Sequence, residues 1–175
     1  MIVVWRVTQR CNLTCPFCEW DRSLPRERTD AVPARVLRFA RVLADYQREA
    51  ADPVLLSWLG GEPTLWAPLH DLAPRLKDLG MAQSTTTNGT TLASPKVQAL
   101  VLRNFRELTV SVDGFPDFHD RLRGMSDGFR RLREGVVQLA AKRASPAALK
   151  LRVNVVLMRH NLGHFAQLCD ALAGW

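Results

Sequence analysis

Three cysteines stand close together near the start of the chain: Cys11, Cys15 and Cys18, in the spacing C-x3-C-x2-C. Cysteine thiolates bind soft metal ions and iron–sulfur clusters. A structural zinc site requires four ligands, and the nearest histidine, His70, lies more than fifty residues further along. Three thiolates suffice for a four-iron cluster that keeps one iron open to a substrate or cofactor. The spacing therefore favours an iron–sulfur cluster over zinc.

The fourth cysteine, Cys169, lies far from the others within a helical pattern, and we expect it to be a small buried side chain. Clustering of the other three is typical of a metal site in a reducing compartment, so a cytoplasmic location is expected. No apolar run reaches the roughly 20 residues of a membrane helix, and Arg6 interrupts the apolar start of the chain. We therefore expect neither a membrane span nor an export signal.

The composition is that of a folded soluble domain. The chain has 175 residues, of which 47% are hydrophobic and 23% charged, a length that suits one domain. Lysine and arginine total 24 against 17 aspartate and glutamate, which gives a net charge of +7. Because the arginines are scattered through helical stretches and form no single stripe, the charge does not indicate nucleic-acid binding.

Short runs rich in β-branched residues alternate with longer helical patterns, which requires parallel strands joined by right-handed crossovers. The fold class is therefore α/β, either an open doubly wound sheet or a barrel or part-barrel. In both architectures the ligand site lies at the carboxyl ends of the strands. Strands are expected at residues 2–7, 54–59, 83–87, 107–112 and 149–157, and helices at residues 33–49, 69–79, 94–103, 128–142 and 162–173.

Unusual residues follow four of these strands, at the rim where a ligand is expected. The cysteines follow the first strand; the later motifs are Gly60-Gly61-Glu62-Pro63, Thr87-Asn88-Gly89 and Ser111-Val112-Asp113-Gly114. Four separate loops therefore converge on one site.

In this order the motifs resemble those of the radical S-adenosylmethionine (radical SAM) superfamily, and the resemblance covers nearly the whole chain. It implies a parallel (β/α) partial barrel of the TIM type. In that family the open iron of a four-iron, four-sulfur (4Fe–4S) cluster binds S-adenosylmethionine. The reduced cluster cleaves this cofactor to methionine and a 5′-deoxyadenosyl radical, which abstracts hydrogen from a substrate.

The resemblance also implies a role for each residue of the motifs. Cys11, Cys15 and Cys18 would bind the cluster. The residues that would bind S-adenosylmethionine are Phe17, Gly60, Gly61, Glu62, Thr87, Asn88, Ser111, Arg123 and Val156.

Within that set, Phe17 and Val156 would pack beside the adenine. The glycines would hold the methionine amino group, with the negative charge of Glu62 nearby. Thr87 and Ser111 would hold the methionine or ribose portion, and Arg123 would pair with the methionine carboxylate. Arg121 competes with Arg123 for that role, and we expect nearby His119 to be structural.

The chain ends at Trp175, one residue after a glycine typical of a helix stop, where a sixth strand is expected. Five βα units alone would leave an unpaired parallel edge strand. We therefore expect residues 1–175 to be one core domain, truncated after about five βα units and without any C-terminal extension.

Several functions stay open. The Ser-x-Asp-Gly motif is most similar to the branch that carries SPASM or twitch extensions, whose members modify ribosomal peptides or tetrapyrroles. Residues 153–161 also resemble the GTP-cyclising enzyme of molybdenum-cofactor synthesis. The rival from another class is a non-catalytic iron–sulfur module. Reduced flavodoxin or ferredoxin is the electron donor that the resemblance implies.

Overall fold

A five-stranded parallel sheet forms the centre of the computed structural model, which describes residues 1–18 and 29–175. The strands lie in the sheet in chain order, without a reversal. A doubly wound sheet requires such a reversal, so this sheet is part of a barrel and the partial-barrel prediction is confirmed. The strands are β1 (Ile2–Thr8), β2 (Leu55–Gly60), β3 (Ala82–Thr87), β4 (Glu107–Ser111) and β5 (Lys150–Asn154).

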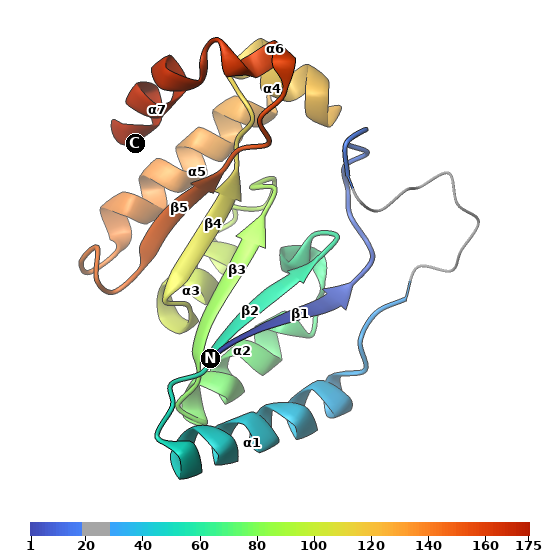
Figure 1. The fold of residues 1–175 in the computed structure, drawn as a ribbon, viewed down its shortest axis with the longest axis vertical. Coiled ribbons are helices and arrows are strands. Elements are labelled where there is room, and N and C mark those ends of the chain that lie inside the picture. Colours follow the sequence, from blue (N-terminus) through green and yellow to red (C-terminus); the bar gives the residue numbers. More distant parts are fainter. Residues whose placement is uncertain (19–28) are drawn as a thin grey trace.

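The helices that join the strands cover one face of this sheet (Figure 1). Proline stands in the first turn of three of the α-helices and of one 3-10 helix, where its missing N–H removes no hydrogen bond. The connecting elements are α1 (Pro33–Ala50), η1 (Pro63–Leu65), α2 (Leu69–Asp78), α3 (Pro95–Asn104), α4 (Pro116–Arg123) and α5 (Gly128–Lys142), followed after β5 by α6 (Arg159–Leu162) and α7 (Phe165–Ala173).

The core lies between the sheet and these helices, because alternate residues of each strand point toward the helices. Trp58 of β2 is fully buried, and its ring centroid lies 6.3 Å from that of Trp5 and 6.2 Å from that of Trp66. Its indole N–H donates to Oε1 of the buried Gln83 at 2.9 Å. The polar groups inside this part of the core are thus hydrogen-bonded, which holds β2 and β3 in register.

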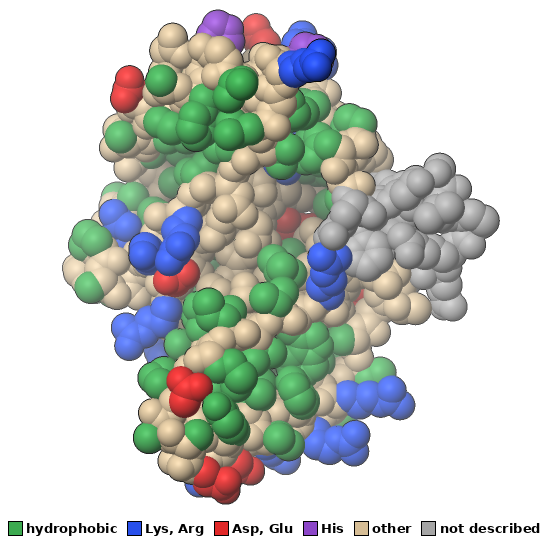
Figure 2. Space-filling model, in the orientation of Figure 1, with side chains coloured by type: hydrophobic (Ala, Val, Ile, Leu, Met, Phe, Trp, Pro, Cys, Tyr) green, Lys and Arg blue, Asp and Glu red, His purple; other side chains and the backbone are tan. Residues whose placement is uncertain are grey.

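The opposite face of the sheet is open in the described part of the chain. Ile2 and Val4 of β1 are 69% and 58% exposed on the side away from the helices. Figure 2 shows hydrophobic side chains gathered over the lower part of this view. On β4 and β5 the Arg152 guanidinium pairs with Glu107 at 3.0 Å. Among the described residues, no helix is long and apolar enough to cross a membrane.

Every expected strand and helix is present, but four expectations about the second half of the chain were wrong. The expected strand at residues 149–157 ends at Asn154, because the next N–H available for pairing, that of Val156, donates to Oδ1 of Asp113 instead. The expected helix at residues 162–173 is two helices, α6 and α7, separated by Gly163 and His164.

Cys169 is exposed and not buried as expected. Its neighbour Leu168 is the buried residue of α7, and successive residues of a helix point about 100° apart. No helix was expected at α4, because its eight residues are too few to show a clear helical repeat of apolar positions. The sequence does mark the end of this helix, because Gly124 adopts the left-handed conformation that commonly ends helices.

Candidate functional site

A cavity of about 240 Å³ lies at the carboxyl ends of the strands, beside the cysteine loop. Among its walls are Leu13, Thr86 and Asn154, which were not among the expected site residues. The register gives a signal for two of them, since Thr86 and Asn154 alternate with strand residues that face the helices. The expected site residues that line the cavity are Cys11, Cys15, Phe17, Cys18, Gly60, Gly61, Thr87, Asn88, Ser111, Arg123 and Val156.

The three cysteines come from one loop that leaves β1 and turns back on itself. The N–H of Cys18 donates to the carbonyl of Cys15 at 3.2 Å, and the N–H of Leu13 donates to Sγ of Cys11 at 3.4 Å. Burial raises the pKa of the Cys15 thiol, the charge of Arg123 lowers it, and the other two cysteines raise it. Among the described residues, Arg123 is therefore the cation whose charge favours the thiolate form of Cys15.

The number of thiols beside the cavity bears on which metal group they can hold. Within the described residues, no three Cys, His, Asp or Glu side chains gather as closely as one shared metal ion requires. A four-iron cluster bonds each cysteine to a different iron and so holds the sulfurs further apart. Three thiols beside one cavity supply the number of protein ligands that such a cluster needs when one iron stays open, whereas a structural zinc ion takes four.

Two glycines at the end of β2 give the cysteine loop its place. A Cβ at Gly60, where φ is 154°, would lie 2.3 Å from the carbonyl oxygen of Thr8, and one at Gly61 would lie 2.1 Å from that of Arg10. The N–H groups of Gly61 and Glu62 donate to these two carbonyls, both at 2.8 Å. Any side chain here would displace the backbone that leads into Cys11.

Glu62 is the one expected site residue that does not line the cavity. Its side chain is fully buried, and burial raises the pKa of its carboxyl group. Oε1 accepts from the hydroxyls of Thr64 at 2.6 Å and Thr87 at 2.7 Å, and Oε2 accepts from the N–H of Asn88 at 2.7 Å. The carboxylate therefore ties the loop after β2 to the end of β3.

Arg123 of α4 reaches the cavity from a buried ion pair. Its Nε donates to Oδ2 of Asp113 at 2.7 Å, and the two side chains are 7% and 0% exposed. Oδ1 of Asp113 accepts from the N–H of Val156 at 3.0 Å, so one carboxylate joins α4 to the segment after β5. The guanidinium also lies 5.5 Å from the ring centroid of Phe17 in the cysteine loop.

The geometry separates Arg123 from its competitor Arg121. Nη1 and Nη2 of Arg123 make no hydrogen bond to another described residue, and Arg123 lines the cavity of the cysteines. Arg121 lines a different cavity, with Phe118 and His160. Of the two arginines, Arg123 is therefore the one that lies beside the cysteines.

His119 supports this arrangement as a neutral side chain. The N–H of Asp113 donates to its Nδ1 at 3.2 Å, which places the ring proton on Nε2. Burial, together with the positive charge of Arg123, lowers the pKa of His119 to about 4. Nε2 has no hydrogen-bond partner among the described residues, and the ring meets Phe129 edge-on at 5.8 Å. His119 thus holds the start of the loop after β4.

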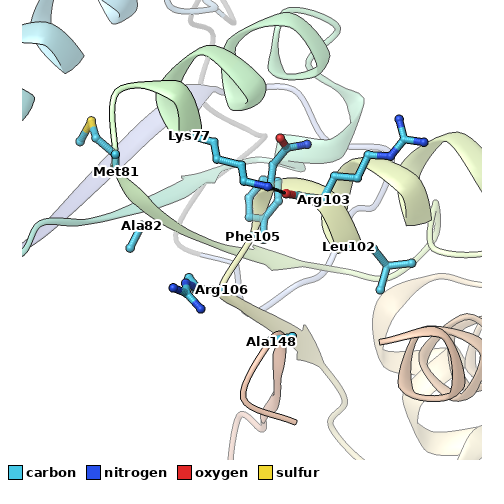
Figure 3. A pocket seen from close by; sticks show the side chains of 10 residues that line it. Lys77, Met81, Ala82, Leu102, Arg103, Phe105, Arg106 and Ala148 are labelled. Carbon is cyan, nitrogen blue, oxygen red and sulfur yellow. Dashed lines mark hydrogen bonds between the residues drawn. The ribbon is translucent and has the colours of Figure 1, made fainter. Parts of the chain in front are cut away.

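A second cavity, of about 480 Å³, lies at the opposite end of the strands (Figure 3). Figure 3 shows Lys77 reaching the backbone of Arg103, whose carbonyl accepts from its Nζ at 2.6 Å. Both residues stand in the last turn of a helix, where cations offset the helix dipole. Lys77 and Arg103 therefore have a structural role at the ends of their helices. The residues expected to bind a cluster and a cofactor lie at the other end of the strands, beside the cysteines.

Comparisons with known proteins give the family. The model of the Radical SAM superfamily matches residues 5–172. The AdoMet-dependent heme synthase of Oleidesulfovibrio alaskensis is 26% identical over 181 residues, which cover 99% of this chain and 44% of that protein. The PqqA peptide cyclase of Xanthomonas axonopodis pv. citri is 30% identical over 164 residues, which cover 91% of this chain and 40% of that protein.

Solved structures show the same fold. Streptococcus suis SuiB bound to S-adenosylmethionine superposes with a TM-score of 0.73 at 22% identity, over 97% of this chain and 36% of that one. SuiB bound to its precursor peptide SuiA also gives 0.73, at 21% identity over 97% and 35%. The present chain thus spans less than half the length of these relatives. Since the family model matches almost all of its residues, the chain belongs to the radical SAM superfamily of enzymes, which use a 4Fe–4S cluster and S-adenosylmethionine.

Proposed function

We propose that this chain is the core of a radical SAM enzyme in which Cys11, Cys15 and Cys18 hold the 4Fe–4S cluster. The observation that carries the proposal is the convergence of the three thiols and the buried Arg123 on one cavity. An electron carrier has no need of a carboxylate-binding arginine beside its cysteines. The arrangement therefore favours an enzyme over a non-catalytic iron–sulfur module.

The walls of the cavity suit the parts of S-adenosylmethionine. The Nη atoms of Arg123, which lines the cavity, would pair with its methionine carboxylate. Ser111 and Asn154 are paired in register at the ends of β4 and β5, where they offer polar groups to the ribose. Phe17 and Val156 supply apolar surface for the adenine. When bound, the reduced cluster would supply the electron that cleaves the cofactor, so that the adenosyl fragment abstracts hydrogen from a substrate.

The proposed substrate is a ribosomally made peptide. The peptide cyclase of Xanthomonas and the SuiB complex with a precursor peptide support this class. A tetrapyrrole is the second candidate, because the heme synthase matches 99% of this chain. Reduced flavodoxin or ferredoxin is the proposed electron donor, since a low-potential cluster requires a strong reductant.

The test is product formation by the anaerobically reconstituted chain with dithionite and S-adenosylmethionine. The parent is expected to form methionine and 5′-deoxyadenosine, and Cys15→Ala to form neither. Cys169→Ala is the matched control, because Cys169 is an exposed residue of α7 outside the cavity, and it is expected to match the parent. Equal product from Cys15→Ala and the parent would refute the proposal.

A further inference from the structure

Hydrogen bonds fix the orientation of the Asn88 side chain at the end of β3. Its Oδ1 accepts from the N–H of Thr90 at 3.0 Å and from the Thr90 hydroxyl at 2.7 Å. A backbone N–H can only donate, so the end of the amide that faces Thr90 must be the oxygen. The NH2 group of Asn88 therefore points to the cysteine loop.

Both hydrogens of that NH2 group have acceptors in the loop. Nδ2 lies 3.0 Å from Oδ1 of Asn12 and 3.6 Å from Sγ of Cys11. The larger sulfur atom makes 3.6 Å a bonding distance for N–H···S. The same sulfur also accepts from the N–H of Leu13 at 3.4 Å. Cys11 thus receives a side-chain donor from the residue that follows β3 as well as a backbone donor from its own loop.

The backbone of Asn88 is held independently of its side chain. Its N–H donates to the buried carboxylate of Glu62 at 2.7 Å, a bond that any residue at this position would keep. A change confined to the side chain therefore leaves the backbone bond that anchors the end of β3. Asn88→Ala also removes the acceptor of the Thr90 N–H and hydroxyl, whereas Asn88→Asp keeps an oxygen for Thr90 and changes only the group that faces Cys11. The pair of variants therefore separates the contact with Cys11 from the support of Thr90.

We propose that Asn88 is a positioning residue that raises the reduction potential of the cluster through its hydrogen bond to Cys11. The inference rests on the proposed function, in which Cys11 is a cluster ligand. Hydrogen bonds to cluster sulfurs stabilise the extra negative charge of the reduced state, and this is one of the recognised determinants of the potential. Asn88 then acts on the cluster, whereas the family resemblance assigned it to S-adenosylmethionine.

The experiment is a redox titration of the reconstituted chain, followed by electron paramagnetic resonance without S-adenosylmethionine. Asn88→Ala is expected to reduce the equilibrium constant for one-electron reduction roughly tenfold, a shift of about 59 mV to lower potential. Asn88→Asp is nearly isosteric and puts a carboxylate oxygen beside Sγ of Cys11. Its potential is expected to fall below that of Asn88→Ala.

Two asparagine variants serve as controls. Asn12→Ala removes the other acceptor of the Asn88 amide but leaves the Cys11 contact. Asn104→Ala makes the same chemical change at the opposite end of the sheet, where Nδ2 donates to Leu100. Both are expected to titrate like the parent.

Iron and sulfide contents and circular dichroism are measured for each protein before the titration. An unchanged potential in both Asn88 variants would overturn the inference, as would an equal shift in Asn12→Ala, which would attribute the effect to loop packing. If the parent takes up no four-iron cluster, the proposed function itself fails, and the inference fails with it.

Discussion

The buried ion pair between Asp113 and Arg123 gives the most quantitative prediction. Asp113→Asn keeps the shape of the side chain but leaves one acceptor oxygen where two are used, by Nε of Arg123 and by the N–H of Val156. It also leaves the guanidinium buried without its opposite charge. Breaking one side of a buried ion pair costs about 3–5 kcal/mol. Since Asn retains one hydrogen bond, we expect a loss of about 3 kcal/mol of unfolding free energy.

The variant is also expected to bind S-adenosylmethionine less tightly, by about tenfold, or about 1.4 kcal/mol, because Arg123 is no longer held toward the cavity. Urea unfolding measures the first effect and equilibrium binding to the reconstituted protein the second. Asp127→Asn is the matched control. Asp127 pairs with Arg130 at the surface and has a φ of 57°, a conformation that Asn tolerates. If Asp113→Asn and Asp127→Asn have the same unfolding free energy and the same affinity for S-adenosylmethionine, the role given to the buried ion pair is wrong.

Two further predictions concern the support of the site. Gly61→Ala places a methyl group against the Arg10 carbonyl and should lower the unfolding free energy by about 1–3 kcal/mol and reduce iron uptake. Gly163→Ala is the control, because a Cβ there meets no atom within 4 Å, and it should change neither the unfolding free energy nor the iron uptake. Equal iron contents in the two variants would count against the packing argument. Because the folded-state pKa of His119 is lowered to about 4, its contribution to stability is present above pH 6.5 and is lost as the pH falls toward 4. Between these values the unfolding free energy of the parent should decrease by about 3 kcal/mol more than that of His119→Gln, and parallel pH profiles in urea would contradict this.

The order of strands and helices was predictable because glycine and proline mark their ends and strand residues repeat at the expected period. The place of the site was predictable for a different reason: parallel strands bring their carboxyl ends to one edge, so motifs far apart in sequence had to meet. The motifs at Cys11, Gly60 and Arg123 do line one cavity. Family resemblance contributed the identity of the cofactors, which spacing alone left open.

Contacts that depend on side-chain direction were not predictable. Glu62 stands among residues that line the cavity, yet its carboxylate turns into the protein toward Thr87 and Asn88. The end of β5 depends on an acceptor from another loop, Asp113, which no local pattern around Val156 reveals. The helix α4 was too short to show a helical repeat of apolar residues, and only its end was marked in the sequence, by Gly124.

The central claim is that one iron of a cluster held by three cysteines is open to S-adenosylmethionine beside Arg123. Electron paramagnetic resonance of the anaerobically reconstituted and reduced chain, with and without S-adenosylmethionine, tests it most directly. We predict a four-iron signal whose shape changes when S-adenosylmethionine is added. An unchanged signal, or zinc bound in place of iron, would contradict the account.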